Sequence, residues 1–224
     1  MQPFTFSPSA DGPDRGALFE FRCWPRVLPE AAGELQRNWT HVRTERRDDI
    51  YLLPPRPGAD LVKLRAGERL EMKHRLGRQG ALELWRTSLS EAFPLPPGPA
   101  ARLSSALGRE GAAALPPGSL LSPSLLLATL WEEGTIACVR LHKTRAVFET
   151  PGARAEVTHL SLSLGDWLTF ALEAEAAEVA EAWIETLGLG DFANLDYGAR
   201  LRAEGLGAPP TARALLRLET PGGG

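Results

Sequence analysis

A period-two alternation of charged and apolar residues recurs along this chain, and it constrains the fold more than any other feature. In the stretch "LVKLRAGERLEMKHRL", Lys63 and Arg65 alternate with apolar residues, and after a short turn Glu71, Lys73 and Arg75 alternate with largely apolar ones. Because successive side chains of a β-strand point to opposite faces, this stretch predicts a hairpin with one charged face.

The same alternation appears in other segments that the sequence predicts as strands. The charged pairs on one face are Glu20 with Arg22, Lys143 with Arg145, Arg154 with Glu156, and Glu173 with Glu175. The opposite faces carry apolar side chains that can pack under helices, namely Phe19, Phe21, Leu64, Met72, Phe170 and Leu172. Many strands with few helices favour an antiparallel barrel or another α+β fold.

Helical patterns separate some of these strands. The stretch "PEAAGELQRNWTHVRT" predicts a helix that begins at Pro29 and places Leu35, Trp39 and Val42 on one apolar stripe. The stretch "AEVAEAWIETLGLG" predicts an amphipathic helix that ends at a glycine cap, Gly188. A last short helix is expected in "LDYGARLRAEG".

The overall charge limits the kinds of partner that the chain attracts. A net charge of -3 gives no general attraction to nucleic acid or to an anionic membrane, so any basic site must be local. We therefore predict neither a nucleic-acid partner nor a membrane partner. The sequence leaves the oligomeric state open.

Cysteine usage and the N-terminal residues indicate a compartment. Cys23 and Cys138 are too few for a disulfide framework, which favours a reducing environment. The start "MQPFTFSPSADGPDRG" has no apolar stretch typical of a signal peptide, and "SLLSPSLLLATLW" is interrupted by Pro123 and too short to cross a bilayer. We expect a cytoplasmic protein with a flexible lead-in at residues 1–16 and a tail at residues 206–224.

The charged faces have a simple explanation and a more specific one. On any single strand, a charged face is most simply the solvated side of a sheet. With so many charged faces, a barrel could instead enclose them, and burying unpaired charges is costly. The glutamates neutralise only some of the cations, so an enclosed face would require an anionic ligand. Arginine and lysine beside clustered carboxylates suit a polyphosphate with Mg²⁺.

The order of the charged pairs resembles the CYTH superfamily, also called triphosphate tunnel metalloenzymes. The motifs that carry the resemblance are E-x-R (Glu20, Arg22), D-x-Y (Asp49, Tyr51), K-L-R (Lys63, Arg65), E-x-K (Glu71, Lys73), K-x-R (Lys143, Arg145), a strand acid (Glu156), and E-x-E (Glu173, Glu175) before a helix that ends in LGL. The resemblance covers residues 17–205. It implies one domain, an eight-stranded antiparallel β-barrel that forms a tunnel flanked by helices, with the charged faces inside.

The resemblance also implies an activity, a cofactor and a set of site residues. The activity is hydrolysis of a small triphosphate, whether inorganic triphosphate, thiamine triphosphate or a nucleoside triphosphate, with Mg²⁺ or Mn²⁺. The implied catalytic residues are Glu20, Lys63, Arg65, Lys143 and Arg145. The implied substrate-binding residues are Arg22, Lys63, Arg65, Lys73, Arg75, Lys143 and Arg145. The implied metal ligands are Glu20, Glu173 and Glu175, and the implied supporting residues are Glu71 and Glu156.

The carboxylates in this set differ in whether an ion pair within the sheet could explain them equally well. Glu71 is also explained by a cross-strand ion pair with a neighbouring lysine, which is common on charged sheet faces. Glu173 and Glu175 are harder to explain in that way, because two carboxylates on one face repel each other unless a cation joins them. A metal-binding role is therefore favoured for Glu173 and Glu175.

One position departs from the family pattern. The family signature begins E-x-E-x-K, whereas the matching stretch here is "LFEFR", so that Leu18 stands where the first glutamate is expected and Arg22 replaces the lysine. The absence of that carboxylate leaves a polyphosphate- or nucleotide-binding module as an alternative to a hydrolase. A class IV-type adenylate cyclase shares the tunnel and is a further alternative. The proline-rich segment 94–118 also lies outside the family pattern.

Other catalytic chemistries lack the residues they require. The four histidines are scattered without metal-ligand spacing, and each is best explained as a structural or surface residue (His41, His74, His142 and His159). The sequence has no C-x-x-C, no G-x-S-x-G, no P-loop and no G-x-G-x-x-G after a predicted strand.

Overall fold

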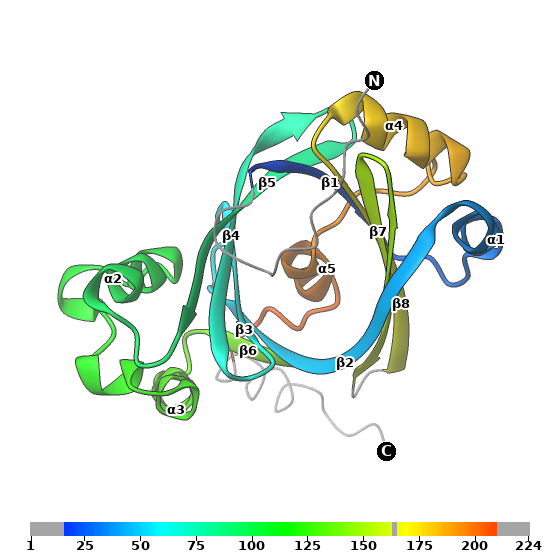
Figure 1. Ribbon diagram of the computed structural model, residues 1–224. Coiled ribbons are helices and arrows are strands. Elements are labelled where there is room, and N and C mark those ends of the chain that lie inside the picture. The colour runs from blue at the N-terminus through cyan, green and yellow to red at the C-terminus, as the bar shows by residue number, and fades with distance from the viewer. Residues whose placement is uncertain (1–15, 163–164, 210–224) are drawn as a thin grey trace, which may run out of the picture. The chain divides into compact units, whose positions relative to one another are not determined.

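The computed structural model describes residues 16–162 and 165–209, and eight strands lie within them. They are β1 (Leu18–Cys23), β2 (Thr40–Leu53), β3 (Asp60–Arg65), β4 (Arg69–Gln79), β5 (Leu82–Ala92), β6 (Ala137–Thr150), β7 (Ala153–Leu162) and β8 (Gly165–Ala174). These strands form a closed antiparallel barrel in the order β1-β5-β4-β3-β2-β6-β7-β8 (Figure 1). The predicted α+β class with an eight-stranded barrel is confirmed. Residues 1–15 of the predicted lead-in and residues 210–224 of the predicted tail lie outside the described residues.

The described residues also include five α-helices. They are α1 (Pro29–Asn38), α2 (Pro97–Ala106), α3 (Pro123–Glu133), α4 (Ala177–Thr186) and α5 (Tyr197–Ala203). Two short 3-10 helices lie between α2 and α3. None of the helices in the described part of the chain is long and apolar enough to cross a membrane.

The chain divides into two compact units. Among the described residues, the first unit consists of residues 16–48, Lys73–Ser88, and the described part of Leu141–Asp196. The second unit consists of Asp49–Met72, Leu89–Arg140 and residues 197–209. Several long strands contribute residues to both units.

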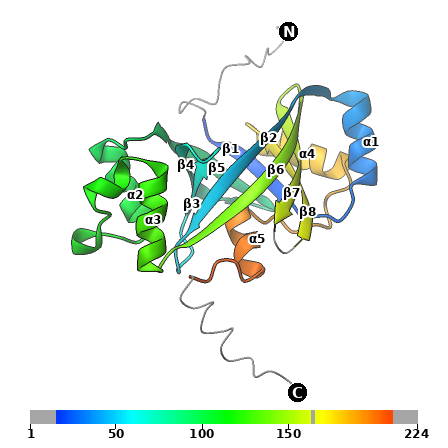
Figure 2. The ribbon, with the colours of Figure 1, turned by 90° about the horizontal axis from the view of Figure 1, so that it is seen from below.

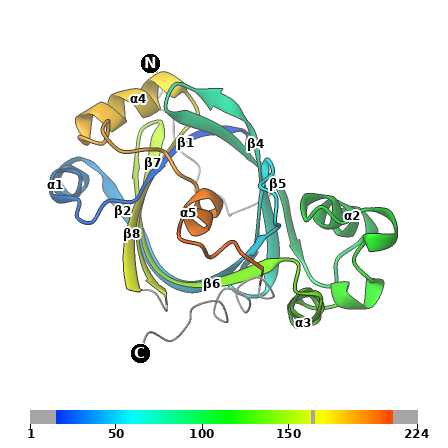
Figure 3. The ribbon, with the colours of Figure 1, turned by 180° about the vertical axis from the view of Figure 1, so that it is seen from behind.

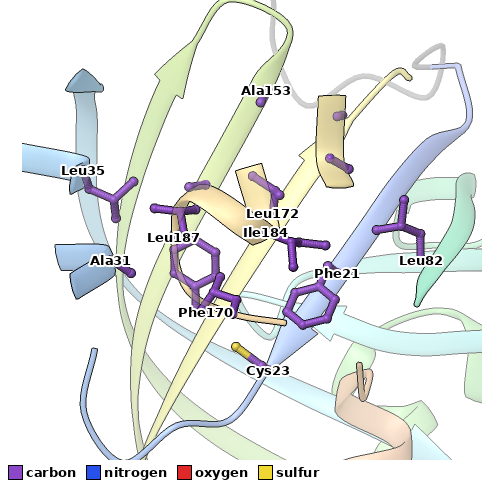
Figure 4. Close-up of a cluster of buried hydrophobic side chains, with 14 of the residues drawn as sticks. Phe21, Cys23, Ala31, Leu35, Leu82, Ala153, Phe170, Leu172, Ile184 and Leu187 are labelled. Carbon is purple, nitrogen blue, oxygen red and sulfur yellow. The ribbon is translucent and has the colours of Figure 1, made fainter. Parts of the chain in front are cut away.

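The core of the first unit lies between helices and the apolar faces of β1, β7 and β8. Phe21 of β1 and Phe170 of β8 are almost completely buried, and Leu35 of α1 and Ile184 of α4 pack into the same cluster (Figure 4). Helices α1 and α4 both lie on the outer side of these strands (Figures 1 and 3). Because the apolar side chains point toward the helices, the alternate charged side chains of β1, β7 and β8 lie on the opposite face.

The core of the second unit lies between the apolar faces of its strands and a helical layer. Leu52 of β2 and Leu64 of β3 are buried in one cluster with Leu103 of α2 and Leu126 of α3. Helices α2 and α3 lie side by side in all three ribbon views (Figure 2). The proline-rich segment therefore supplies a helical cover for part of the second unit.

The helix predicted to begin at Pro29 is correct at its start and wrong at its end. Helix α1 ends at Asn38, and the next residues are the beginning of β2 rather than a further helical turn. Trp39 has an extended backbone, with φ -118° and ψ 146°, and Val42 is exposed. The physical reason is the β-branched composition of "THVRT", which favours a strand and removes the apolar stripe at this point.

The glycine cap predicted after the later helix is confirmed, and the chain then returns to β1. Gly188 has a φ of 65°, which glycine adopts without a Cβ clash. Further along, the amide of Leu195 donates to the carbonyl oxygen of Arg22 at 2.8 Å, and Asn194 Oδ1 accepts from the Arg22 amide at 2.8 Å. These bonds fix the backbone of β1 where its charged residues lie.

Candidate functional site

The charged face of the first unit is assembled by strand register. Glu20 of β1 lies directly opposite Glu173 of β8, and Glu173 lies directly opposite Arg154 of β7. Arg22 and Glu156 both lie opposite the same residue of β8, Ala171, from its two sides. Since paired residues of neighbouring strands share a face, these five charged groups converge on one surface.

Glu156 is the centre of the basic half of this face. Its Oε1 lies 3.1 Å from Arg145 Nη1 and 3.7 Å from Arg154 Nη2, and its Oε2 lies 3.7 Å from Arg22 Nη2. All four side chains are at most 10% exposed. Burial alone would raise the pKa of Glu156, but Arg145, Arg22 and Arg154 lower that pKa far below its usual value. One ionised carboxylate therefore holds three guanidinium groups together.

A second carboxylate supports Arg145 from the side of β2. Arg145 Nε lies 3.1 Å from Glu45 Oε1, and Arg47 Nη1 lies 2.7 Å from the same oxygen. Arg22 is also oriented by a neutral group, because its Nη1 donates to Thr169 Oγ1 at 3.3 Å. The arginine heads are therefore fixed before any ligand binds.

The acidic half of the face is built around one lysine. Lys73 Nζ donates to Glu20 Oε1 and lies 3.5 Å from Glu173 Oε1. Glu173 Oε2 also lies 4.0 Å from Arg154 Nη1. Burial, together with the neighbouring Glu173, raises the pKa of Glu20, and the attraction of Lys73 only partly opposes that shift.

Basic side chains gather at one part of this face. Three buried guanidinium groups, those of Arg22, Arg145 and Arg154, lie around the single carboxylate of Glu156. Elsewhere on the face, strand register places further carboxylates, with Glu83 opposite Glu20 and Glu149 opposite Arg154. Lys143 is on the same face of β6 as Arg145 and is only 4% exposed. Three guanidinium groups gathered in a buried place are costly to hold together, and a bound anion reduces that cost.

Two buried polar atoms of the face point to the same chemistry. Within the described part of the chain, Arg154 Nε and Thr158 Oγ1 are buried without a hydrogen-bond partner. Both residues belong to β7 and alternate with apolar residues of the core, so both lie on the charged face. A buried donor without an acceptor is destabilising, and a phosphate oxygen is an acceptor of the right kind.

Arg75, predicted to bind substrate, has protein partners. Its Nη1 lies 3.0 Å from Glu83 Oε1, and its guanidinium lies 5.7 Å from the ring centre of Trp85. Glu83 is buried, and it also accepts hydrogen bonds from Arg78 and from the indole of Trp85. A ligand role for Arg75 stays a prediction.

Only two of the three predicted metal ligands lie close to each other. Glu20 and Glu173 are neighbours across two strands, whereas Glu175 is exposed and lies just after the end of β8. In the described ranges, no three acidic, histidine or cysteine side chains are grouped closely enough to hold a metal ion. Mg²⁺ commonly uses one or two carboxylates together with phosphate oxygens and water. The pair Glu20 and Glu173 fits that mode of binding. It does not by itself form a site in which the protein supplies all the ligands.

The predicted residues of the second unit form a cluster of their own. Lys63 Nζ lies 2.5 Å from Glu71 Oε1, and Arg65 Nη1 lies 3.0 Å from Glu71 Oε2. Asp49 is paired with Arg65 in the register of β2 and β3, and its Oδ1 accepts from the Ala66 amide at 3.3 Å. Glu71 thus orients both cations of the K-L-R motif, and the predicted binding role of these cations stays a prediction.

Sequence reasoning missed several residues of the face in the first unit. The sequence places Arg154 on a charged strand but does not mark it as a site residue, although it lies near both Glu156 and Glu173. The signal in the sequence is that Arg154 and Glu156 both alternate with apolar residues, which places the two on one face. Glu45 and Arg47 follow directly after the segment predicted as a helix, so the sequence does not indicate their position on β2.

Comparison with known proteins bears on the fold. No protein-family model matches the sequence, and no curated protein sequence matches it significantly. Among solved structures, it is similar to HpAC1 from Hippeastrum, a proposed adenylyl cyclase described as showing a dominant triphosphatase activity. The TM-score is 0.50 at 15% identity, and the match covers 84% of this chain and 96% of that one. This chain shares the fold of HpAC1. The fold implied by the resemblance to the CYTH superfamily is thereby confirmed.

Two further solved structures are similar at lower scores. A proposed adenylate cyclase from Bacillus halodurans has a TM-score of 0.44 at 11% identity, over 84% of this chain and 98% of that one. The PH1819 protein from Pyrococcus horikoshii has a TM-score of 0.47 at 11% identity, over 84% and 99%. At these TM-scores the two likenesses support no conclusion about this chain.

Proposed function

We propose that this protein binds a small triphosphate on the charged face of the first unit and hydrolyses it. The observation that carries the proposal is the cluster of three buried guanidinium groups around the one carboxylate of Glu156, including the unsatisfied Arg154 Nε. An anion with several oxygens in a row satisfies such a face better than a single carboxylate does. The fold shared with HpAC1 is compatible with this function.

The arginines and lysines of the face have distinct parts in the proposal. Arg145, Arg154 and Arg22 present planar guanidinium groups that bind phosphate oxygens in pairs, and Lys143 and Lys73 act as compact charges. Phosphoryl transfer depends mainly on positioning and on the neutralisation of oxygen charge in the transition state. Because Glu156 and Glu45 already orient Arg145, little rearrangement is needed when the ligand binds.

Mg²⁺ or Mn²⁺ belongs to the proposal as a cofactor that binds with the phosphate. When bound, such an ion would supply positive charge that offsets the charge of the phosphoryl oxygens. Glu20 and Glu173 are the residues that would hold it. Glu175 is exposed, which leaves its predicted metal role the least supported of the three.

The cations of the second unit have a separate status. The binding and catalytic roles that the CYTH resemblance implies for Lys63 and Arg65 stay predictions, and within the second unit Glu71 pairs with both of them.

A cytoplasmic setting is proposed as well. Cys23 and Cys138 form no disulfide, and burial raises their thiol pKa values to about 12 and about 11, so both thiols stay protonated at neutral pH.

The experiment is a phosphate-release assay with inorganic triphosphate, thiamine triphosphate and ATP, each with Mg²⁺ or Mn²⁺. We expect turnover of at least one substrate, and we expect Arg145→Ala to reduce it by about 100-fold or more, the scale typical of removing one transition-state interaction. Arg26→Ala is the matched control, because Arg26 is an exposed arginine. Pyrophosphate and a cyclic nucleotide as products from ATP would instead identify an adenylate cyclase.

A binding module without catalysis is the second candidate. It is favoured by Leu18, which stands on the charged face of β1 where the resemblance to the CYTH superfamily implies a glutamate, and by the exposure of Glu175. Saturable binding of triphosphate without turnover at any metal concentration would support the module and overturn the hydrolase. If neither binding nor turnover is found, both proposals are wrong.

A further inference from the structure

Lys73 lies where two acidic side chains meet across neighbouring strands of the charged face. Its ammonium group contacts Oε1 of Glu20 and lies 3.5 Å from Oε1 of Glu173. Both carboxylates are largely buried, with side chains 12% and 10% exposed. The oxygens that suit a divalent cation are therefore already neutralised by the protein itself.

The second oxygen of Glu173 reinforces this arrangement. It lies 4.0 Å from Arg154 Nη1, so both oxygens of this carboxylate face cations. A divalent ion entering from solvent would have to displace the ammonium group and would stand beside a guanidinium. Without an added anion, such an exchange crowds positive charge in a buried place, which is unfavourable.

Lys73 is also the member of this group that can most easily move. Its side chain is 23% exposed, the largest exposed fraction in the trio, and it ends a flexible four-carbon stem. A phosphate bound near Arg154 would offer the ammonium group an alternative partner. The same phosphate would supply negative charge and oxygen ligands to an incoming metal ion.

We propose that Lys73 closes the Glu20–Glu173 pair to divalent cations, so that the metal ion binds only together with a phosphate ligand. This inference rests on the proposed function and adds an order of binding to it. By linkage, the phosphate then raises the affinity for the metal ion by the same factor by which the metal ion raises the affinity for the phosphate, typically about 5–150-fold. Lys73 is a positioning residue in this scheme.

The test measures Mn²⁺ binding to the full chain without phosphate, by electron paramagnetic resonance of the unbound ion. We expect the unchanged protein to bind Mn²⁺ weakly or not at all, and Lys73→Met to bind it at least about tenfold more tightly, within the usual range of coupling energies. The double variant Lys73→Met with Glu173→Gln should lose that gain. Arg26→Met is the matched control, because it removes an exposed positive charge.

Three outcomes would overturn the inference. They are equal Mn²⁺ affinity in the unchanged protein and Lys73→Met, a gain in Arg26→Met as large as in Lys73→Met, and a gain that survives Glu173→Gln. Thermal melts verify that each variant is folded, and Lys73→Gln replaces Lys73→Met if the latter is not. Because the measurement needs no turnover, a protein that fails the phosphate-release assay can still pass this test. A protein that releases phosphate can likewise fail it.

Discussion

Replacing Glu156 by glutamine removes one negative charge from the centre of three guanidinium groups. The substitution weakens the ion pair with Arg145 at 3.1 Å and those with Arg22 and Arg154 at 3.7 Å each. Glutamine keeps the shape and one oxygen acceptor, so the change is mainly one of charge. Breaking a buried ion pair by removing one partner typically costs 3–5 kcal/mol, and the retained acceptor places Glu156→Gln at about 3 kcal/mol.

The expected destabilisation is large enough to measure by thermal unfolding. For a chain of this size, 1 kcal/mol corresponds to about 2–4 °C in Tm, so Glu156→Gln should lower Tm by roughly 6–12 °C at neutral pH. Circular dichroism melts of Glu156→Gln and of the control Glu185→Gln, an exposed residue of α4, provide the comparison. The control should melt within about 2 °C of the unchanged protein.

The pH dependence of this difference follows from the lowered pKa of Glu156. Because the folded state holds the carboxylate ionised more strongly than the unfolded state does, its stabilising effect is complete above the ordinary glutamate pKa of 4.5. The effect is lost as the pH falls below that value toward the folded pKa. The Tm gap between the unchanged protein and Glu156→Gln should therefore narrow in acid.

An anion gives a second check on the same variant. Inorganic triphosphate should raise the Tm of Glu156→Gln by more than that of the unchanged protein, because the bound anion replaces the missing charge. A Tm equal to that of the unchanged protein at neutral pH, or a gap that does not change between neutral and acid pH, would refute the reasoning about this cluster.

Three further predictions concern other parts of the structure. Lys143→Ala should weaken triphosphate binding by about tenfold or more, measured by calorimetry, because Lys143 is buried on the charged face. The exposed control Arg26→Ala should leave the affinity unchanged, and equal affinities for the two variants would remove Lys143 from the site. Leu18→Glu should raise Mn²⁺ affinity in the presence of triphosphate, measured by the same resonance method, since it adds a carboxylate beside Glu20 on the same face of β1; an unchanged affinity would contradict this. Phe170→Ala should lower the free energy of unfolding by about 3–5 kcal/mol in urea melts, because Phe170 is completely buried; a decrease below about 1 kcal/mol would contradict the packing described for the first unit.

Strand alternation made an antiparallel, strand-rich fold predictable from the sequence, and it predicted which charged side chains share a face. The closed eight-stranded barrel was implied by the resemblance to the CYTH superfamily. The period of two in "LFEFRC" places Phe21 in the core and Glu20 and Arg22 on the opposite face, as the structure has them. Similar reasoning placed Arg145 and Glu156 on a common face. Local alternation determines which face a side chain lies on, and this holds whatever the strands are paired with.

Interactions between strands were harder to predict, because they depend on register and on where each strand ends. Glu175 keeps the parity of Glu173, but β8 ends at Ala174, so the two carboxylates do not share the face. The substrate-binding role that the resemblance implies for Lys73 stays a prediction. Its contact with both Glu20 and Glu173 depends on the pairing of β1 with β8, which no local pattern shows. Because α1 ends early, β2 begins at Thr40 and includes Glu45, which no local pattern indicated.

A crystal structure of the protein with inorganic triphosphate, without added metal, tests the central claim most directly. We predict that phosphate oxygens lie within hydrogen-bond distance of Arg145 and Arg154, with Arg154 Nε donating to one of them. Triphosphate bound elsewhere on the surface, with the ion pairs of Glu156 to its three arginines unaltered and no anion beside them, would contradict it.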